Sequence, residues 1–229
     1  MNIRYISAIA LTLFYTQFST KAQNLSSGAS ARVGKFSGNA LVTIEMGNVI
    51  FRIPEAYLLI SPTHDDANRP EGLRFALLAL LPDFSPKTPE NRKYFDEKGW
   101  GNKVNIFIDY KGYAKTGMDL FLFNRSFYKS SEIRSGNYGY YVFGDSDSKV
   151  GLDYLFKGSI EAPHDFVECD KSDSVPYPSC NRIILVGRDI VVKYTVSRKY
   201  LDVMSRIDGD LISFLNGLRI NGPTLEFIQ

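Results

Sequence analysis

Short apolar runs separated by turn-forming residues recur along most of the chain, and their spacing indicates β-strands. The strand-like runs at 40–45 and 49–53 are joined by Met46, Gly47 and Asn48. Because Gly and Asn tolerate positive φ, these two runs predict a tight hairpin. Further strands are predicted at 103–110, 138–143, 152–156, 166–169, 182–186 and 190–196.

Other segments can be interpreted in more than one way. The apolar run at 73–81 fits either a central strand or a buried helix, because periodicity alone does not separate the two. Pro82 ends the run, which favours a strand. Residues 88–91 resemble a helix start, with a threonine as cap and a proline in the first turn, and predict a short helix ending near 98. The secondary structure of 119–127 is ambiguous.

The C-terminal part has the clearest helical pattern. Ser197 is a candidate N-cap, and apolar residues then recur every three or four positions, at Tyr200, Val203, Met204, Ile207, Leu211, Phe214, Leu215 and Leu218. Such a stripe predicts an amphipathic helix that covers one face of a sheet. Many strands followed by one closing helix predict an α+β fold, with a mostly antiparallel β-sheet and a C-terminal amphipathic helix packed on one face.

Residues 1–22 have the three parts of a secretory signal peptide. Arg4 precedes an apolar run at 5–15, and the small residues Thr20 and Ala22 follow where a signal peptidase cleaves. The run is shorter than the ~20 apolar residues that span a bilayer. We therefore expect a cleaved leader, no transmembrane segment after cleavage, and a periplasmic protein.

The rest of the chain divides into a polar linker at 23–32 and a single domain at 33–229. An apolar fraction of 44% and an aromatic fraction of 14% exclude a disordered chain. Loss of the leader lowers the number of basic residues from 27 to 25, which equals the number of acidic residues. A neutral chain without a basic cluster is a poor match for phosphate backbones, so we exclude nucleic acid as a partner.

Cys169 and Cys180 bracket a loop rich in turn-forming residues and are the two cysteines of the chain. In an oxidising compartment such a pair forms a disulfide. The alternatives are a reactive thiol, which would need a nearby histidine, and half of a zinc site, which would need two closer-spaced pairs. The sequence favours a structural disulfide.

Motifs of known catalytic and cofactor sites are missing from the sequence. It contains no G-x-S-x-G elbow, P-loop, G-x-G-x-x-G or H-E-x-x-H. The Asp-rich stretch after Gly144 differs from a calcium loop, because Val150 and Phe156 stand where Gly and Glu are required. His64 and Asp65 could form a metal or acid–base site, but no third ligand is within sequence reach. We expect no cofactor, no metal and no catalytic residue.

Aromatic and acidic residues in loops are the candidates for binding another protein. Aromatic side chains serve as interface anchors, and acidic loops steer association. These candidates are Asp65, Asp66, Trp100, Tyr138, Tyr140, Asp145 and Asp147. In a strand over 138–143, Tyr138 and Tyr140 would share one face. Burial as ordinary strand packing is the alternative for this aromatic stretch.

Several segments resemble a known group of proteins. They are the Pro-stopped strand and its continuation at 51–58, the pair 80–83 and 88–91, and the cysteine loop followed by 191–201. Together they resemble a family of small exported proteins of Gram-negative bacteria without assigned activity. Some members are encoded near interbacterial toxin systems, including type VI secretion effectors. The resemblance implies that a periplasmic member is an immunity protein, and it supplies no catalytic residue.

Export and the missing motifs favour a non-catalytic periplasmic protein that binds another protein. The most concrete form is an immunity protein that neutralises a toxin effector by plugging its active site. One alternative is an exported hydrolase with a site around His64 and Asp65. The other is an envelope accessory factor that acts as a scaffold.

Overall fold

The structure is a computed structural model that describes residues 40–60, 74–110, 116–127, 133–143 and 151–228. All of them belong to one compact unit, Ser37–Gln229. The expected leader and linker lie outside the described residues, so their boundaries stay predictions.

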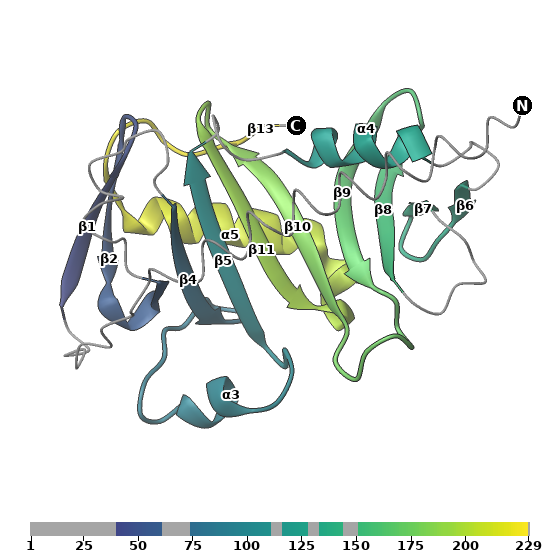
Figure 1. Cartoon of the computed structure of the whole chain (residues 1–229). Coiled ribbons are helices and arrows are strands. Elements are labelled where there is room, and N and C mark those ends of the chain that lie inside the picture. Colours follow the sequence, from purple (N-terminus) through teal and green to yellow (C-terminus); the bar gives the residue numbers. More distant parts are fainter. Residues whose placement is uncertain (1–39, 61–73, 111–115, 128–132, 144–150, 229) are drawn as a thin grey trace, which may run out of the picture. The chain divides into compact units, whose positions relative to one another are not determined.

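A ten-stranded sheet forms the centre of this unit (Figure 1). Its neighbouring strands pair antiparallel throughout the described part. In spatial order it contains β3 (Leu58–Ile60), β4 (Arg74–Leu80), β5 (Lys103–Tyr110), β11 (Ile190–Ser197), β10 (Ser179–Val186), β9 (Pro163–Asp170), β8 (Leu152–Gly158), β7 (Tyr141–Phe143) and β6 (Ile133–Ser135), with β13 (Phe227–Ile228) paired to the end of β10. The mostly antiparallel sheet predicted from the sequence is confirmed.

A second sheet contains three strands, β1 (Leu41–Met46), β2 (Val49–Pro54) and β12 (Arg219–Asn221). The predicted hairpin is confirmed, because β1 and β2 pair antiparallel from Met46–Val49 onward. Gly47 has a φ of +59°, which residues with a Cβ rarely adopt and which the tight turn requires. A 3-10 turn (Glu55–Tyr57) then leads from β2 into β3.

The closing helix, α5 (Met204–Leu218), packs behind the ten-stranded sheet (Figure 1). Its buried side chains include Ile207, Leu211 and Leu215, so the predicted apolar stripe faces the sheet. The helical segment begins directly after Ser197, as predicted, but its first part is a 3-10 helix (Arg198–Val203) and the Ser197 side chain makes no capping hydrogen bond.

Two further helices lie at the ends of strands. The short helix α3 (Arg92–Asp96) begins later than predicted, because Thr88 and Asn91 hydrogen-bond each other in a turn before it. The ambiguous segment forms α4 (Gly117–Phe127). The run at 73–81 is a strand, as favoured, because β4 pairs along its length with β5.

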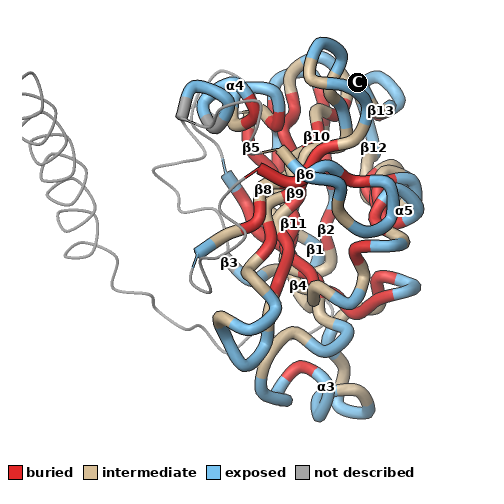
Figure 2. The backbone as a smooth tube through the Cα atoms, turned by 90° about the vertical axis from the view of Figure 1, so that its right-hand side faces the viewer, coloured by how far each residue is buried: buried red, intermediate tan, exposed pale blue. Residues whose placement is uncertain are grey.

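Buried residues concentrate between the ten-stranded sheet, α5 and the small sheet (Figure 2). A smaller aromatic cluster of Phe121, Phe143 and Phe156 lies under α4. Figure 2 shows α4 and α5 on opposite sides of the ten-stranded sheet. The sheet therefore has an inner face, covered by α5, and an outer face, partly covered by α4.

Candidate functional site

Strand β10 carries polar residues on both of its faces. On the inner face, Arg182 lies between the buried residues Cys180 and Ile184. On the outer face, Asn181 and Ile183 are half-buried. Because side chains alternate between faces along a strand, the two faces of β10 present different groups.

The outer face has a row of polar side chains that crosses neighbouring strands in direct register. Tyr154 of β8 pairs with Glu168 of β9, and Glu168 pairs with Asn181 of β10. Asn181 pairs in turn with Thr195 of β11, which pairs with Asn105 of β5. The Thr195 hydroxyl donates a 2.7 Å hydrogen bond to Oδ1 of Asn181. Directly opposed polar side chains can interact across strands, so the row is an ordered polar stripe.

Glu168 is the carboxylate of this row. Burial raises the pKa of its carboxyl above the ordinary value, while the positive charge of Lys193 lowers it and Asp170 raises it. A carboxylate in this setting gains from a nearby cation, because a positive charge offsets part of its lost hydration. Glu168 is therefore a candidate contact for a basic group of a partner.

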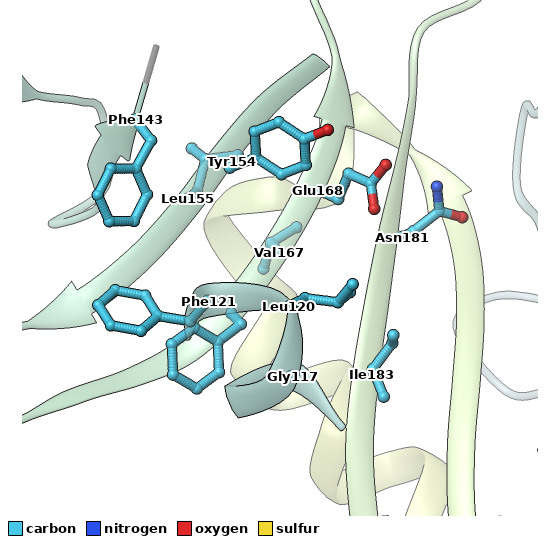
Figure 3. A pocket seen from close by; sticks show the side chains of 11 residues that line it. Gly117, Leu120, Phe121, Phe143, Tyr154, Leu155, Val167, Glu168, Asn181 and Ile183 are labelled. Atoms are coloured by element: carbon cyan, nitrogen blue, oxygen red, sulfur yellow. The ribbon is translucent and has the colours of Figure 1, made fainter. Parts of the chain in front are cut away.

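A pocket beneath α4 adjoins this row (Figure 3). Glu168 and Asn181 project at its edge, while Phe121 and Phe143 line its apolar side. Its volume is about 30 Å³. This is the space open to the centre of a water-sized sphere, so the pocket can hold ordered water.

Hydrogen bonds between Thr116 and Asp119 fix the start of α4 beside this pocket. The Thr116 hydroxyl and backbone N–H both donate to Oδ2 of Asp119 at 2.7 Å, and the Asp119 N–H donates back to the Thr116 hydroxyl. This reciprocal arrangement caps the helix. A Cβ on Gly117 would lie 2.9 Å from the ring of Phe166, so a glycine is needed for this close approach to β9.

The inner face holds a buried ion-pair network centred on Arg182, whose side chain is 2% exposed. Its Nη2 donates to Asp208 of α5 at 2.9 Å and to Asp165 of β9 at 2.8 Å. Its Nη1 donates to the carbonyl of Phe166 at 3.0 Å. Burial alone would lower the pKa of Arg182, but the charge of Asp208 and its hydrogen bonds raise it overall.

The other polar groups of the network complete this pairing. The Tyr194 hydroxyl donates to Oδ1 of Asp208 at 2.7 Å, and burial first, then the charge of Asp208, raises the pKa of Tyr194 well above its usual value. Nζ of Lys157 lies 3.6 Å from Oδ2 of Asp165. The positive charges of Lys157 and Arg182 thus neutralise the carboxylates of Asp165 and Asp208. The contact between Arg182 and Asp208 holds α5 to the sheet.

A β-bulge aims Asp165 into this network. The register of β8 and β9 shifts between Leu155 and Lys157. Asp165 has a φ of +55°, a left-handed conformation that Asp tolerates better than most residues. Bulges change the direction of side chains, and here the carboxylate reaches the buried guanidinium.

Sequence reasoning missed this network, although part of its signal was present. Asp208 stands directly after Ile207 and three residues before Leu211, within the apolar stripe of the helix. Arg182 occupies an inward position of a strand that is otherwise apolar on that face. A charge of each sign on two buried faces indicates an ion pair between the two elements.

The predicted disulfide is present between Cys169 and Cys180, with an S–S distance of 2.02 Å. The two residues are directly opposite each other on β9 and β10. It joins the strands at the end where the intervening loop leaves the sheet. The disulfide therefore holds together the two strands that carry Glu168 and Arg182.

The structure separates the residues predicted to bind a partner. The Tyr138 side chain is exposed, whereas Tyr140 is buried at 2% exposure. The two do not share a strand face, because β7 begins only at Tyr141 and residues 138–140 form a turn. Burial raises the pKa of the Tyr140 hydroxyl to about 12, with smaller effects from nearby charges.

Trp100 is half-buried in the loop before β5. The glycine before it, Gly99, approaches the ring of Tyr177 in the disulfide-closed loop. Asn102, two residues later, accepts a 2.8 Å hydrogen bond from Nζ of Lys199. Tyr138 lines a surface hollow with Lys199. The structure thus brings Trp100 and Tyr138 to the loops at the same end of β11.

The remaining candidate residues lie outside the described residues: His64, Asp65, Asp66, Asp145 and Asp147. The hydrolase alternative around His64 therefore stays a prediction. Within the described ranges, no group of three His, Cys, Asp or Glu side chains is arranged to hold a metal ion. None of the helices in the described ranges has both the length and the apolar composition to cross a membrane.

Among solved structures, the chain is similar in fold to an immunity protein of the Stenotrophomonas maltophilia type IV secretion system. The TM-score is 0.55 at 16% sequence identity, and the match covers 80% of this chain and 94% of that protein. No protein-family model and no curated protein sequence matches this chain. At this identity the likeness shows a shared fold, and the association with type VI effectors stays a prediction.

Proposed function

We propose that the protein is a non-catalytic immunity protein that neutralises a secreted toxin by binding it. The observation that carries this proposal is the fold, which is shared with an immunity protein over 94% of that protein's length. Two chains that share this fold at 16% identity differ at most positions, so the fold tolerates many substitutions. This suits a binding scaffold whose contact surface changes with its partner.

The use of charges inside the protein supports binding over catalysis. The carboxylates of Asp165 and Asp208 are paired with Arg182 and Lys157. A general acid or base must be able to reach a substrate. The charged groups of the inner network hold α5 to the sheet. We therefore assign binding of a partner protein to surface residues.

We place the protein in the periplasm, with residues 1–22 as a cleaved leader. The disulfide between Cys169 and Cys180 supports this location, because disulfides persist in oxidising compartments. A toxin acting in the periplasm would meet its immunity protein there. The product of the gene beside this chain's own gene is the first candidate toxin to test, and candidates from type IV and type VI systems are both included.

The test is neutralisation in living cells. The candidate toxin is directed to the periplasm of a bacterial host, with and without the full chain expressed with its own leader. We expect growth arrest by the toxin alone and restored growth with the chain. The purified pair should also form a complex of defined stoichiometry in size-exclusion chromatography.

An unrelated periplasmic toxin serves as the control, and the chain should give no protection against it. Failure to bind or neutralise any of the candidate toxins would contradict the proposed function. In that case an envelope scaffold or a hydrolase site around His64 becomes the better hypothesis.

A further inference from the structure

Tyr138 occupies a backbone position that its residue type disfavours. The Tyr140 N–H donates to the carbonyl of Asn137 at 3.1 Å, which closes a four-residue turn. The two central residues, Tyr138 and Gly139, have φ of +59° and +76°. Positive φ at both central positions defines a type I′ turn, in which Asn, Asp or Gly is favoured at the first central position.

A bulky residue at this position is sterically unfavourable, and little burial offsets the strain. The Tyr138 side chain is 60% exposed, the largest exposed fraction among the large apolar and aromatic side chains of the described residues. Strained residues with exposed side chains occur where function needs that side chain. Asn at this position would fit the backbone conformation of the turn with less strain. We therefore infer that the ring of Tyr138 serves a purpose other than folding stability.

A hollow of about 320 Å³ lies beside this ring. Its lining residues are Asn137, Tyr138, Ser172, Pro178, Arg198, Lys199 and Leu201. The lining contains two cations and no carboxylate, so the hollow favours a negatively charged group.

The two cations differ in their availability. Nη2 of Arg198 donates to Asp153 at 2.7 Å, and Nη1 donates to the carbonyl of Asp170, so this guanidinium is already paired. Nζ of Lys199 donates to the side-chain oxygen of Asn102 at 2.8 Å. Among the described residues, no carboxylate lies within ion-pair distance of Lys199. Lys199 is therefore the cation that an incoming carboxylate can pair with.

We propose that Tyr138 and Lys199 form a docking site for the toxin, which presents an Asp, Glu or C-terminal carboxylate beside an apolar side chain. The carboxylate pairs with Lys199 in the hollow, and the apolar side chain packs on the ring of Tyr138. This proposal rests on the proposed function. An exposed aromatic beside a cation that has no carboxylate partner among the described residues is the arrangement expected of an interface anchor.

The test combines stability and affinity in single variants of the full chain. Tyr138→Asn places a favoured residue in the turn, so we expect a melting temperature higher by about 2 °C. The same variant should bind the purified toxin from the neutralisation assay about tenfold or more weakly. A variant that is more stable but binds less well cannot owe its defect to misfolding.

Lys199→Gln keeps a donor for Asn102 and removes the charge. We expect binding about fivefold weaker at low salt, with a smaller dependence of affinity on salt concentration than in the wild type. Arg188→Gln is the matched control, because Arg188 is an exposed cation in the turn at the opposite end of β10 and β11. It should leave both affinity and salt dependence unchanged.

The outcomes separate this proposal from the proposed function. If the wild type binds toxin and both variants bind equally well, the docking site is wrong while the immunity function stands. A lower melting temperature for Tyr138→Asn would also overturn the site, because the ring would then serve the fold. If the wild type binds no candidate toxin, the function fails and the docking site fails with it.

Discussion

The inner and outer faces of strand β10 use polar residues in opposite ways. On the inner face, Arg182 is 2% exposed, and Asp208, Asp165 and a backbone carbonyl occupy its guanidinium. On the outer face, Asn181 and Glu168 are half-buried at the edge of the pocket under α4. The charged groups of the inner network are engaged in structure, whereas Glu168 and Asn181 on the outer face stay partly open to solvent.

This difference shows why burial alone does not identify a functional residue. The most buried charge of the described chain, Arg182, serves to hold a helix to a sheet. By contrast, Tyr138 has no such task and sits on a strained turn at the surface. If this comparison is correct, substitutions on the inner face should affect stability strongly, and those on the outer face weakly.

The largest effect is expected from Asp208→Ala. This variant leaves Arg182 buried without its main carboxylate, and removing one partner of a buried ion pair costs about 3–5 kcal/mol of unfolding free energy. Denaturant unfolding measures the loss. Asp210→Ala, at an exposed position of the same helix, is the control and should change stability little. Equal stability of the two variants would mean that the inner network is dispensable.

Removal of the disulfide should have the next largest effect. The double variant Cys169→Ser with Cys180→Ser frees a loop with a sequence separation of 11, and the chain-entropy model gives a loss of about 3 kcal/mol. Unfolding of the wild type with and without reductant provides an independent measurement. A double variant as stable as the oxidised wild type would contradict the prediction.

On the outer face, Gly117→Ala tests how closely α4 approaches the sheet. The added Cβ would lie 2.9 Å from the Phe166 ring and 3.3 Å from the carbonyl of Ile183, so we expect a loss of about 1–2 kcal/mol from overpacking. Gly209→Ala in α5 is the matched control. Its Cβ would meet nothing within 4 Å, and the substitution should stabilise the helix. Thermal melts of both variants measure the effects, and a stabilised Gly117→Ala would contradict the close approach.

The smallest effect is expected from Glu168→Gln, and it depends on pH. Because burial raises the pKa of the folded carboxyl above 4.5, ionisation costs stability. The cost is absent below the ordinary pKa, grows as the pH rises through the raised pKa, and is constant above it. The variant should therefore melt slightly higher than the wild type at about pH 7 and equally near pH 3.5. A difference that grows towards acid pH would show the opposite sign of shift.

Sequence pattern predicted the strands well, because alternation along β5 and the turn at Gly47 are local properties. It located the closing helix but predicted an α-helix from Ser197 onward, since apolar residues three apart, such as Tyr200 and Val203, fit a 3-10 turn as well as an α-helical one. The pairing of Arg182 with Asp208 could not be assigned, because it joins a strand and a helix through tertiary contact. Exposure likewise separated Tyr138 from Tyr140, which the sequence grouped together.

The small sheet has a consequence for the order in which the protein folds. Phe51 of β2 pairs with Arg219 of β12, near the other end of the chain, and Phe227 of β13 pairs with Val186. Synthesis proceeds from the N-terminus, so β2 can pair with β1 early, but its second partner, β12, is made only when the chain is almost complete. Such long-range pairing slows folding. For a chain exported as we propose, this late pairing would delay completion of the fold until after translocation.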